Sequence, residues 1–446
     1  MIKTDSRRIV KGDIFVALRG IKSDGHNYIE DAINNGCSMV ICEYGSYSVP
    51  YLIVSDTREY LKQYIKDNYS KYINDMTIIG ITGTNGKTTI ASFIHQTLNK
   101  MGSKCSMIGT LGFYMDNKVC SLPNTCPDMA LLYEYIIESY NNGYKCVVIE
   151  ASSQGLDEDR LYGVLFDFAV FTNLTHDHLD YHGSIDNYIK AKQKLFSMLK
   201  STGKSIINID DPFYKNFYTD NAITYGFNQC DFCIEDYFEN GFKFKYDDTK
   251  YEVLFDYVGK HNIYNMMVCI IVLYNLQFSF EKIMEVVKTV KLPKGRMEIY
   301  KYKSNKIIID YAHTPDAIEK VLSSLSDYNK IYAVFGCTGN RDRDKRPIMT
   351  NLLLQKCEQV IITSDDLYDE SFESIVSDML SLRKSDNYDI CYHRGLAIKK
   401  GISFLEKNDI LLVLGKGHEE YIKIADKLIP FSDSKVVLDI TNLTSK

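Results

Sequence analysis

The segment 80–89, which reads GITGTNGKTT, constrains the fold of this chain more than any other feature. It overlaps an apolar run over 76–82 that is typical of a buried strand, and a helical pattern over 89–102 follows it. A glycine-rich turn at such a junction points backbone N–H groups and the positive end of a helix dipole at an anion. Lys87 adds a mobile charge for the β- and γ-phosphates of a nucleotide, and Thr88 adds a hydroxyl for Mg²⁺. We therefore expect a nucleotide-binding domain with a parallel sheet.

The loop departs from the strict phosphate-loop pattern at one position. The strict pattern has a glycine five residues before the glycine of Gly-Lys, and Ile81 stands there. The alternative is a glycine turn that binds no ligand. We favour the nucleotide site because Gly-Lys-Thr between a strand and a helix has few purely structural explanations.

Strand-like and helix-like runs alternate along the whole chain, which indicates parallel sheets covered by helices on both faces. With 446 residues the chain is too long for one ordinary core. We expect a small N-terminal α/β domain over 1–74, a central parallel-sheet ATPase domain over 75–291 and a C-terminal α/β domain over 292–446. Short alternating segments over 220–258 favour antiparallel strands at the edge of the central sheet.

Composition argues against several classes of protein. The net charge of -6 and the lack of a long basic run argue against nucleic-acid binding. No apolar stretch is long enough to span a bilayer, so we expect no membrane insertion. The 12 cysteines show no repeating spacing and no secretory signal precedes them, which favours reduced thiols in the cytoplasm. Cys230 and Cys233 form one CxxC pair, which we interpret as two ordinary thiols rather than a zinc or redox site.

Two candidate metal ligands follow predicted strands. Glu150 ends the strand-like segment CVVIE over 146–150, where ligands usually meet a parallel sheet. His178 lies in NLTHDHLDYHG, which crowds three histidines and two aspartates behind another strand. A solvated polar loop is the alternative for this second segment.

Segments from one end of the chain to the other resemble the Mur ligase family. They are DSRRIVKGDIFVALRGIKSDGHNYI, GITGTNGKTT, IEASSQGLDEDRL, FDFAVFTNLTHDHLDYHGS, YIKAKQKLF, GKHNIYN, GRMEI, DYAHTPDAIEKVL, FGCTGNRDRDKRP and GKGHEE. The resemblance implies a uridine-nucleotide-binding N-terminal domain, an ATP- and Mg²⁺-binding central domain and a Rossmann-like C-terminal domain for an amino acid. It implies that ATP drives the addition of the third stem-peptide residue to UDP-MurNAc-L-Ala-D-Glu in peptidoglycan synthesis, through an acyl phosphate. We expect a monomer.

The resemblance carries roles onto individual residues. The ATP-binding positions are Gly83, Thr84, Asn85, Gly86, Lys87, Thr88, Thr89, Asn262, Asn265, Arg296, Asp310 and His313. The UDP-substrate positions are Ser6, Thr125, Ser152 and Arg160, with the loop 20–23. The catalytic positions are Lys87, Glu150, His178 and Lys192, and the metal positions are Thr88, Glu150, His178 and Lys192. The amino-acid positions are Arg341, Asp365, Asp366, Tyr368, Gly415 and Glu419.

Lys192 aligns with a lysine that the family carbamylates. Carbamylation would turn an ammonium, which repels Mg²⁺, into an anionic oxygen ligand. From the residues alone, Lys192 is one of several lysines on a helix and indicates a solvated face, and Lys190 and Lys194 are the alternatives if the register differs.

Two substrate positions depart from the family pattern. Cys126 replaces the second of two adjacent threonines, and Glu158 stands where glutamine is common, which would place a negative charge near an anionic substrate.

The amino-acid site departs further. Enzymes for meso-diaminopimelate carry Asp-Asn-Pro-Arg, whose arginine binds the distal carboxylate, and this chain reads DDLY over 365–368. Asp365 and Asp366 favour a cationic side chain such as L-lysine or ornithine. Diaminopimelate stays possible if Arg343 or Arg383 replaces the missing arginine. A third interpretation is that the acidic segment simply caps a helix.

Other functions stay open at this point. A Mur-ligase-like enzyme could act on a different acceptor outside the main cell-wall pathway, and the unusual DDLY segment would suit it. A folylpolyglutamate-synthetase-like enzyme would lack the N-terminal domain. A GTPase would need Asn-Lys-x-Asp after a strand, which the chain does not contain. A non-catalytic scaffold is disfavoured because Lys87, Thr88, Glu150, His178 and Lys192 are all present.

Overall fold

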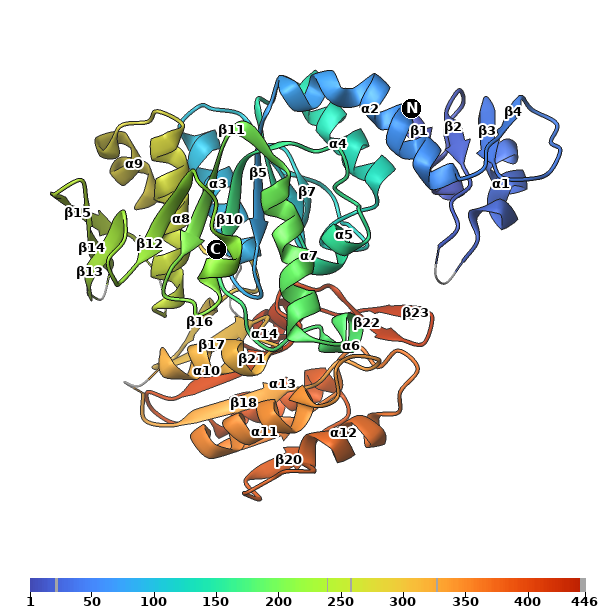
Figure 1. The fold of residues 1–446 in the computed structure, drawn as a ribbon. Helices are drawn as coiled ribbons and strands as arrows, with labels where there is room; N and C mark the ends of the chain where they lie inside the picture. The colour runs from blue at the N-terminus through green and yellow to red at the C-terminus, as the bar shows by residue number, and fades with distance from the viewer. Residues whose placement is uncertain (21–22, 239, 257–258, 326–327, 442–446) are drawn as a thin grey trace.

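The computed structural model describes residues 1–20, 23–238, 240–256, 259–325 and 328–441. In these ranges the strands form a four-stranded, an eleven-stranded, a six-stranded and a two-stranded sheet. Figure 1 shows the small first sheet to one side of the large second sheet and the third sheet below it. The predicted fold class, a central parallel-sheet domain flanked by two further α/β domains, is confirmed.

The N-terminal sheet is parallel throughout, in the order β1-β2-β3-β4. Its strands are β1 (Ile2–Lys3), β2 (Ile14–Val16), β3 (Met39–Cys42) and β4 (Tyr51–Ile53). The helices of this part are η1 (Ser6–Arg8), η2 (Gly25–Tyr28), α1 (Ile29–Asn34) and α2 (Thr57–Asn74). Helix α2 leads to the central domain and packs on its helix α4, where the rings of Tyr69 and Tyr133 stack at 5.9 Å between centroids.

The central sheet has the order β15-β14-β13-β12-β11-β10-β5-β9-β6-β7-β8. Its strands are β5 (Thr77–Thr82), β6 (Cys105–Gly109), β7 (Gly112–Tyr114), β8 (Lys118–Cys120), β9 (Cys146–Glu150), β10 (Phe166–Phe171), β11 (Leu199–Asn208), β12 (Ala222–Gly226), β13 (Phe232–Phe238), β14 (Gly241–Tyr246) and β15 (Thr249–Leu254). The antiparallel edge predicted over 220–258 is confirmed for β13, β14 and β15, whereas β12 pairs in parallel with β11. A second antiparallel edge, formed by β6, β7 and β8, was not predicted.

Helices cover both faces of the central sheet, as its almost uninterrupted apolar strands require. They are α3 (Lys87–Lys100), α4 (Met129–Asn141), α5 (Ser153–Asp157), α6 (Leu179–His182), α7 (Ile185–Ser197), η3 (Tyr214–Phe217), α8 (His261–Asn275) and α9 (Phe280–Val287). Successive side chains of β5 point to opposite faces. Ile78 packs in the cluster with α2, α4 and α7, and Ile79 packs in the cluster with α3, α8 and α9.

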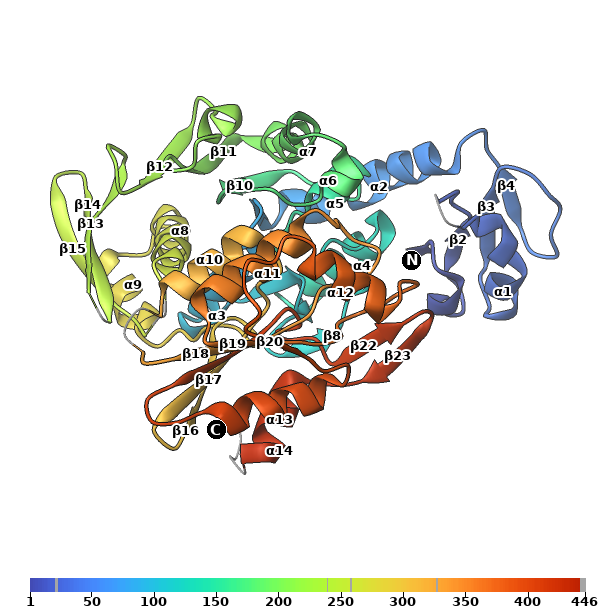
Figure 2. The same cartoon turned by 90° about the horizontal axis from the view of Figure 1, so that it is seen from below.

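The C-terminal sheet has the order β16-β17-β21-β18-β19-β20 and is parallel except for β16. Its strands are β16 (Glu298–Tyr302), β17 (Asn305–Asp310), β18 (Ile331–Phe335), β19 (Gln359–Ile362), β20 (Tyr388–Ile390) and β21 (Ile410–Leu414). The remaining elements are α10 (Pro315–Ser323), α11 (Lys345–Lys356), α12 (Phe372–Leu380), α13 (Arg394–Phe404), α14 (Asp433–Thr441) and the hairpin β22 (Tyr421–Ile424) with β23 (Lys427–Pro430). Figure 2, seen from below, shows this domain in front of the central one.

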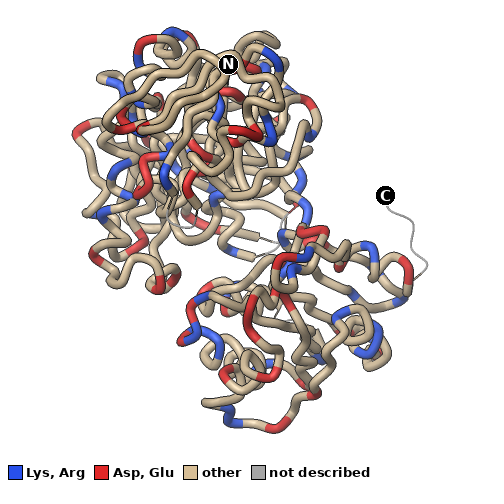
Figure 3. Tube along the Cα trace, turned by 90° about the vertical axis from the view of Figure 1, so that its right-hand side faces the viewer, with Lys and Arg blue, Asp and Glu red and all other residues tan. Residues whose placement is uncertain are grey.

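Two further features are the hydropathy of the helices and the distribution of charged residues. Among the described residues, no helix is both long and apolar enough to cross a membrane. Figure 3 shows lysine and arginine interspersed with aspartate and glutamate along the trace of all three domains.

Candidate active site

The phosphate loop lies between the end of β5 and the first turn of α3. Gly83 and Gly86 have φ values of +144° and +92°, which favour glycine. A Cβ atom at Gly83 would overlap the Oγ1 atom of Thr172. The loop therefore needs its glycines both for conformation and for space.

The segment after β10 holds this loop in place. The backbone N–H of Thr84 donates to the carbonyl of Asn173 at 2.8 Å, and that of Asn85 donates to the Asn173 side-chain oxygen at 3.0 Å. The hydroxyl of Thr172 donates to the carbonyl of Asn85 at 2.7 Å. The loop is thus preorganised by residues that follow β10, and the sequence analysis assigns no role to Asn173.

Lys87 and Thr88 occupy the start of α3, where the helix dipole is positive. Lys87 Nζ donates to the carbonyls of Gly83 and Thr84, at 2.8 and 2.9 Å. Burial lowers the pKa of Lys87, and the nearby Arg296 lowers it further. Thr88 donates to Glu150 Oε2 at 2.8 Å, so the predicted hydroxyl and carboxylate ligands are in direct contact. Thr89 follows on the same helix and is buried.

Glu150 lies at the end of β9, beside β5, with its side chain completely buried. Its carboxylate accepts hydrogen bonds from the backbone N–H of Thr110 at 2.9 Å and from the Thr110 hydroxyl at 3.1 Å. Thr110 also contacts the hydroxyl of Thr125 at 3.0 Å. Thr110 thus links Glu150, a predicted metal ligand, to Thr125, a predicted substrate contact.

Lys192 is buried, and its interpretation as part of a solvated face is wrong. Its residue is 1% exposed on α7, whereas Lys190 on the same helix is exposed. Lys192 Nζ donates to the carbonyl of Gly83 at 2.9 Å and lies 4.4 Å from the ring centroid of Tyr188. Burial lowers the pKa of Lys192 well below its ordinary value, and the charge of Lys87 adds to that effect. A neutral, nucleophilic amine next to the phosphate loop is therefore favoured.

His178 directly precedes α6 as its N-cap residue and has a left-handed backbone, at φ +54°. Half of its side chain is exposed, and its Nε2 atom lies 3.4 Å from Asp177 Oδ2. Burial, with the charges of Lys192 and Lys87, lowers the pKa of His178 to about 4. At neutral pH its imidazole is therefore neutral and can lend a lone pair to a cation.

The C-terminal domain contacts this region directly. Lys345 Nζ donates to the buried carboxylate of Asp177 at 3.0 Å, and His176 Nε2 lies 3.1 Å from Asp342 Oδ2. Asn85 of the phosphate loop donates to Asp316 at 2.7 Å. In Figure 1 the ends of α6 and α7 point down towards this domain. No role is predicted for Lys345 from the sequence, although it lies in FGCTGNRDRDKRP, a segment that resembles the family.

We expect Lys345→Met to open the molecule. The change leaves Asp177 without its cation, which costs up to about 3–5 kcal/mol when the charge stays buried. Separation of the domains would let water reach Asp177, so small-angle scattering should give a larger radius of gyration. The matched control Lys356→Met removes an exposed lysine at the other end of α11 and should leave the radius unchanged. Equal radii for both variants would contradict a docking role of the pair.

Acid should weaken the same contact. Burial raises the pKa of Asp177, but the charges of His178 and Lys345 outweigh it and the pKa is lowered. The stabilisation is complete above the ordinary pKa of an aspartic acid, about 3.9, and is lost as the pH falls below that value.

The linker to the C-terminal domain brings Arg296 to the phosphate loop. Arg296 Nη2 donates to the Thr88 hydroxyl at 3.3 Å, and its guanidinium lies 4.6 Å from the ring centroid of Tyr311. Asp310 accepts the backbone N–H groups of Met297 and Ala312, both at 2.7 Å. Asp310 therefore fixes the backbone next to Arg296.

Three other predicted ATP positions surround the loop. On α8, Asn265 donates to Asn262 at 3.0 Å, and a Cβ atom at Gly86 would lie 2.7 Å from Asn265 Oδ1. His313 holds its Nδ1 atom 2.7 Å from the Tyr311 carbonyl. Burial lowers the pKa of His313 to about 4.

The predicted UDP-substrate positions lie in two places. Ser6 is buried in the N-terminal domain, and Ser152 caps α5 by accepting the N–H of Gly155 at 3.1 Å. Arg160 pairs with Glu158 at 2.7 Å and donates to the Cys126 carbonyl at 2.8 Å. The negative charge of Glu158 is thus already matched by Arg160. Within the loop 20–23, residues 21–22 lie outside the described residues.

The predicted amino-acid site contains an unpredicted cation. Lys416 is completely buried, and its Nζ atom lies 2.9 Å from Asp366, 3.5 Å from Asp365 and 2.7 Å from Glu419. Burial lowers the pKa of Lys416, but these carboxylates outweigh it and raise the pKa. Lys416 therefore already pairs with Asp365 and Asp366, the carboxylates that the sequence analysis expects to favour a cationic side chain. Gly415 adjoins them, with φ +108°.

The remaining interpretations of this segment are also decided by contacts. Helix α12 begins at Phe372 and is capped by Ser371, so Asp365 and Asp366 do not cap it. Arg343 pairs with Asp378 at 2.8 Å and Arg383 with Asp386 at 3.2 Å. Neither arginine is free to replace the one missing at position 368.

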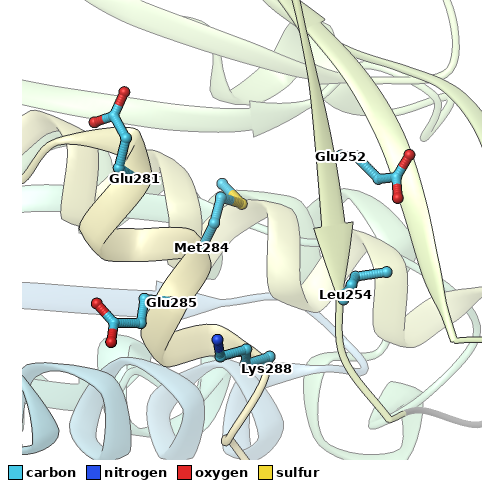
Figure 4. Close-up of a pocket in the computed structure, with 6 residues that line it drawn as sticks. All are labelled: Glu252, Leu254, Glu281, Met284, Glu285 and Lys288. Atoms are coloured by element: carbon cyan, nitrogen blue, oxygen red, sulfur yellow. The ribbon is translucent and has the colours of Figure 1, made fainter.

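A shallow hollow of about 310 Å³ lies elsewhere, between β15 and α9. Figure 4 shows its lining residues, which are Glu252, Leu254, Glu281, Met284, Glu285 and Lys288. It lies at the antiparallel edge of the central sheet and holds no predicted site residue.

Comparisons with known proteins agree along the whole chain. Residues 1–73 match the model described as "Mur ligase family, catalytic domain", 81–273 match "Mur ligase middle domain" and 295–417 match "Mur ligase, glutamate ligase domain". A UDP-N-acetylmuramoyl-L-alanyl-D-glutamate–2,6-diaminopimelate ligase of Clostridium perfringens is 37% identical, over 98% of this chain and 94% of that protein. One of the same name from Fusobacterium nucleatum is 38% identical, over 98% and 92%.

Solved structures show the same fold. A structure of a UDP-N-acetylmuramoyl-L-alanyl-D-glutamate–2,6-diaminopimelate ligase matches with a TM-score of 0.65 and 30% identity, over 99% of this chain and 94% of that one. The MurF ligase from Thermotoga maritima in complex with ADP matches with a TM-score of 0.74 and 19% identity, over 99% and 96%.

Proposed function

The chain belongs to the Mur ligase family, and from this we propose that it is an ATP-dependent ligase that adds a diamino acid to UDP-MurNAc-L-Ala-D-Glu. The observation that carries the proposal is the buried Lys192 amine, held by the carbonyl of Gly83 in the phosphate loop. The relatives at 37% and 38% identity are named for the same acceptor. We propose that the domains over 1–74, 75–291 and 292–446 bring the UDP-linked acceptor, ATP and the amino acid together.

ATP would bind along the phosphate loop. The N–H groups of Gly83–Thr89 and the dipole of α3 suit the phosphates, and Lys87 would turn from the loop carbonyls to the β- and γ-phosphates. Asn262 and Asn265 would contact the adenine side of the nucleotide, and His313 would complete that wall. Arg296, which donates to Thr88 in the phosphate loop, would contact the same phosphates from the linker, and Asp310 would position it.

The donors near the loop fit Mg²⁺, a hard cation that prefers oxygen ligands. The Thr88 hydroxyl and the Glu150 carboxylate are in contact, and His178 is a neutral imidazole whose pKa is lowered by the charges of Lys192 and Lys87. Bound Mg²⁺ would offset the repulsion between the phosphates and the acceptor carboxylate. Lys192 fits this set only as a carbamate. Its neutral amine would attack CO₂, an N–C bond would form and one proton would leave. The resulting carbamate would carry a negative charge, opposite to that of Lys87.

The proposed reaction has two steps. The acceptor carboxylate attacks the γ-phosphorus of ATP, an acyl phosphate forms and ADP leaves. The free amine of the amino acid then attacks the acyl carbon, the amide forms, phosphate leaves and the amine loses a proton. Lys87 and Arg296 would stabilise charge on the transferred phosphoryl group. The contacts between Asp177 and Lys345 and between Asn85 and Asp316 would keep water from the acyl phosphate.

The acceptor would extend from the N-terminal domain to Glu150. Ser6 would contact the uridine end, and Thr125, Ser152 and Arg160 would contact the muramoyl peptide. Arg341, Asp365, Asp366, Tyr368, Gly415 and Glu419 would surround the incoming amino acid. We expect a monomer, because all of these residues come from one chain.

The test is phosphate release from ATP with UDP-MurNAc-L-Ala-D-Glu and one amino acid per tube: L-lysine, L-ornithine or meso-diaminopimelate. We expect release that depends on the amino acid, together with a new tripeptide product seen by mass spectrometry. A tube without amino acid is the control. No phosphate release in any tube would refute this acceptor. It would favour a ligase that works on a different acceptor, which the unusual DDLY segment would suit.

A further inference from the structure

The backbone around Tyr368 is hydrogen-bonded to the hairpin β22–β23. Tyr368 has a left-handed backbone at φ +49° and forms a parallel bridge with Ile424 of β22. The Leu367 N–H donates to the Lys423 carbonyl at 2.8 Å, and the Ala425 N–H donates to the Tyr368 carbonyl at 2.8 Å. The hairpin β22–β23 is therefore fastened to the DDLY segment, and it brings its own side chains there.

Two cations flank the Tyr368 ring. Lys423 Nζ lies 4.7 Å from the ring centroid, and the Arg341 guanidinium lies 6.0 Å from it. Among the described residues, neither cation forms an ion pair. Lys423 is also close to the buried carboxylates, because its backbone N–H donates to Asp366 Oδ1 at 2.8 Å. Two unpaired cations thus flank one ring, and one of them lies beside the acidic side chains.

We propose that Lys423 binds the carboxylate at the far end of a diaminodicarboxylic acid, in place of the guanidinium that is missing at Tyr368. This inference rests on the proposed function and names the substrate class of the same site. Arg341 would bind the second carboxylate, and the Tyr368 ring would hold the two cations apart. Asp365, Asp366 and Glu419 share the single charge of Lys416, so Asp366 and Glu419 would retain negative charge for the ammonium groups.

The charges of the site match such a substrate. Asp365, Asp366 and Glu419 contribute three negative charges, and Lys416, Lys423 and Arg341 contribute three positive ones. A diaminodicarboxylic acid has two carboxylates and two amino groups, so it can satisfy both free cations. L-Lysine has one carboxylate and would leave one cation unmatched. A site built to pair a carboxylate discriminates against a ligand that lacks it.

The other cations nearby are already engaged. Lys416 is completely buried and holds three carboxylates. Arg343 and Arg383 pair with aspartates. Lys423 is partly exposed and therefore accessible to an incoming ligand.

The test compares Lys423→Met with Lys427→Met in steady-state ligation of meso-diaminopimelate and L-lysine. Lys427 is an exposed lysine on the partner strand of the same hairpin, opposite Ile424, so it controls for loss of surface charge. We expect Lys423→Met to raise the KM for meso-diaminopimelate roughly 10- to 100-fold, the loss that follows when a charged hydrogen-bond partner is removed. Its kcat should change little, and L-lysine kinetics should stay as in the wild type. Lys423→Arg should retain most of the affinity.

The outcomes separate this inference from the proposed function. An unchanged KM for meso-diaminopimelate in Lys423→Met, an equal effect in Lys427→Met, or a wild type that uses L-lysine better would overturn the role of Lys423 and leave the ligase intact. Equal losses with both amino acids would also overturn it, because they indicate a structural effect. A wild-type enzyme that ligates none of the amino acids would refute the proposed function itself.

Discussion

Replacing Lys192 with alanine is expected to abolish ligation, with kcat falling by roughly 10³-fold or more. The side chain is buried against the phosphate loop, and burial together with Lys87 keeps its pKa well below the ordinary value. A lowered pKa increases the share of the neutral amine, which is the form that reacts with CO₂. Alanine removes both the amine and the anionic ligand that it would become. Phosphate release with the full set of substrates measures the effect.

Bicarbonate and a neighbouring lysine provide the controls. CO₂-free buffer should lower wild-type activity and added bicarbonate should restore it, whereas bicarbonate should restore nothing in Lys192→Ala. Lys190→Ala removes an exposed lysine from the same helix and should behave as the wild type. Activity should also fall in acid as the Lys192 amine gains a proton, below its ordinary pKa because that pKa is lowered. Full activity in Lys192→Ala would mean that another group completes the metal site.

Lys87→Ala should lower kcat by roughly 10³-fold, since one preorganised cation on a transferred phosphoryl group has an effect of that size. Lys87 lies at the first position of α3, and within the described part of the chain its Nζ donates to the carbonyls of Gly83 and Thr84 and pairs with no carboxylate, so it can turn to phosphates. Single-turnover phosphoryl transfer measures the chemical step without product release.

A lysine at the other end of the same helix is the matched control. Lys100 is exposed and donates to Thr289, so Lys100→Ala should retain kcat. If Lys87→Ala raised the KM for ATP and left kcat unchanged, Lys87 would stabilise the bound nucleotide and the transition state equally. The proposed role in the transition state would then be wrong.

Long apolar runs were predicted well, and short strands were not. The strand predicted over 76–82 is β5, which begins one residue later, at Thr77. The helix over 89–102 begins earlier, at Lys87, because Gly86 caps it. The strands β7 and β8 have three residues each and depend on pairing with β6. Hairpin β22–β23 turns at Ala425, with φ +49° and no glycine, so no turn signal marks it.

The sequence by itself determined the family, the phosphate loop and the list of polar residues at strand ends, because these depend on local spacing along the chain. Only the tertiary structure decided which of those residues are buried and which are already paired. In the sequence Lys192 is one of several lysines, whereas in the structure α7 holds it against Gly83. In the sequence Asp365 and Asp366 look like free carboxylates, whereas in the structure both pair with Lys416. Lys423 had no sequence signal at all, because its position beside Tyr368 comes from a hairpin more than fifty residues later in the chain. Charge pairing and burial act through space, so they are fixed by packing and not by order in the sequence.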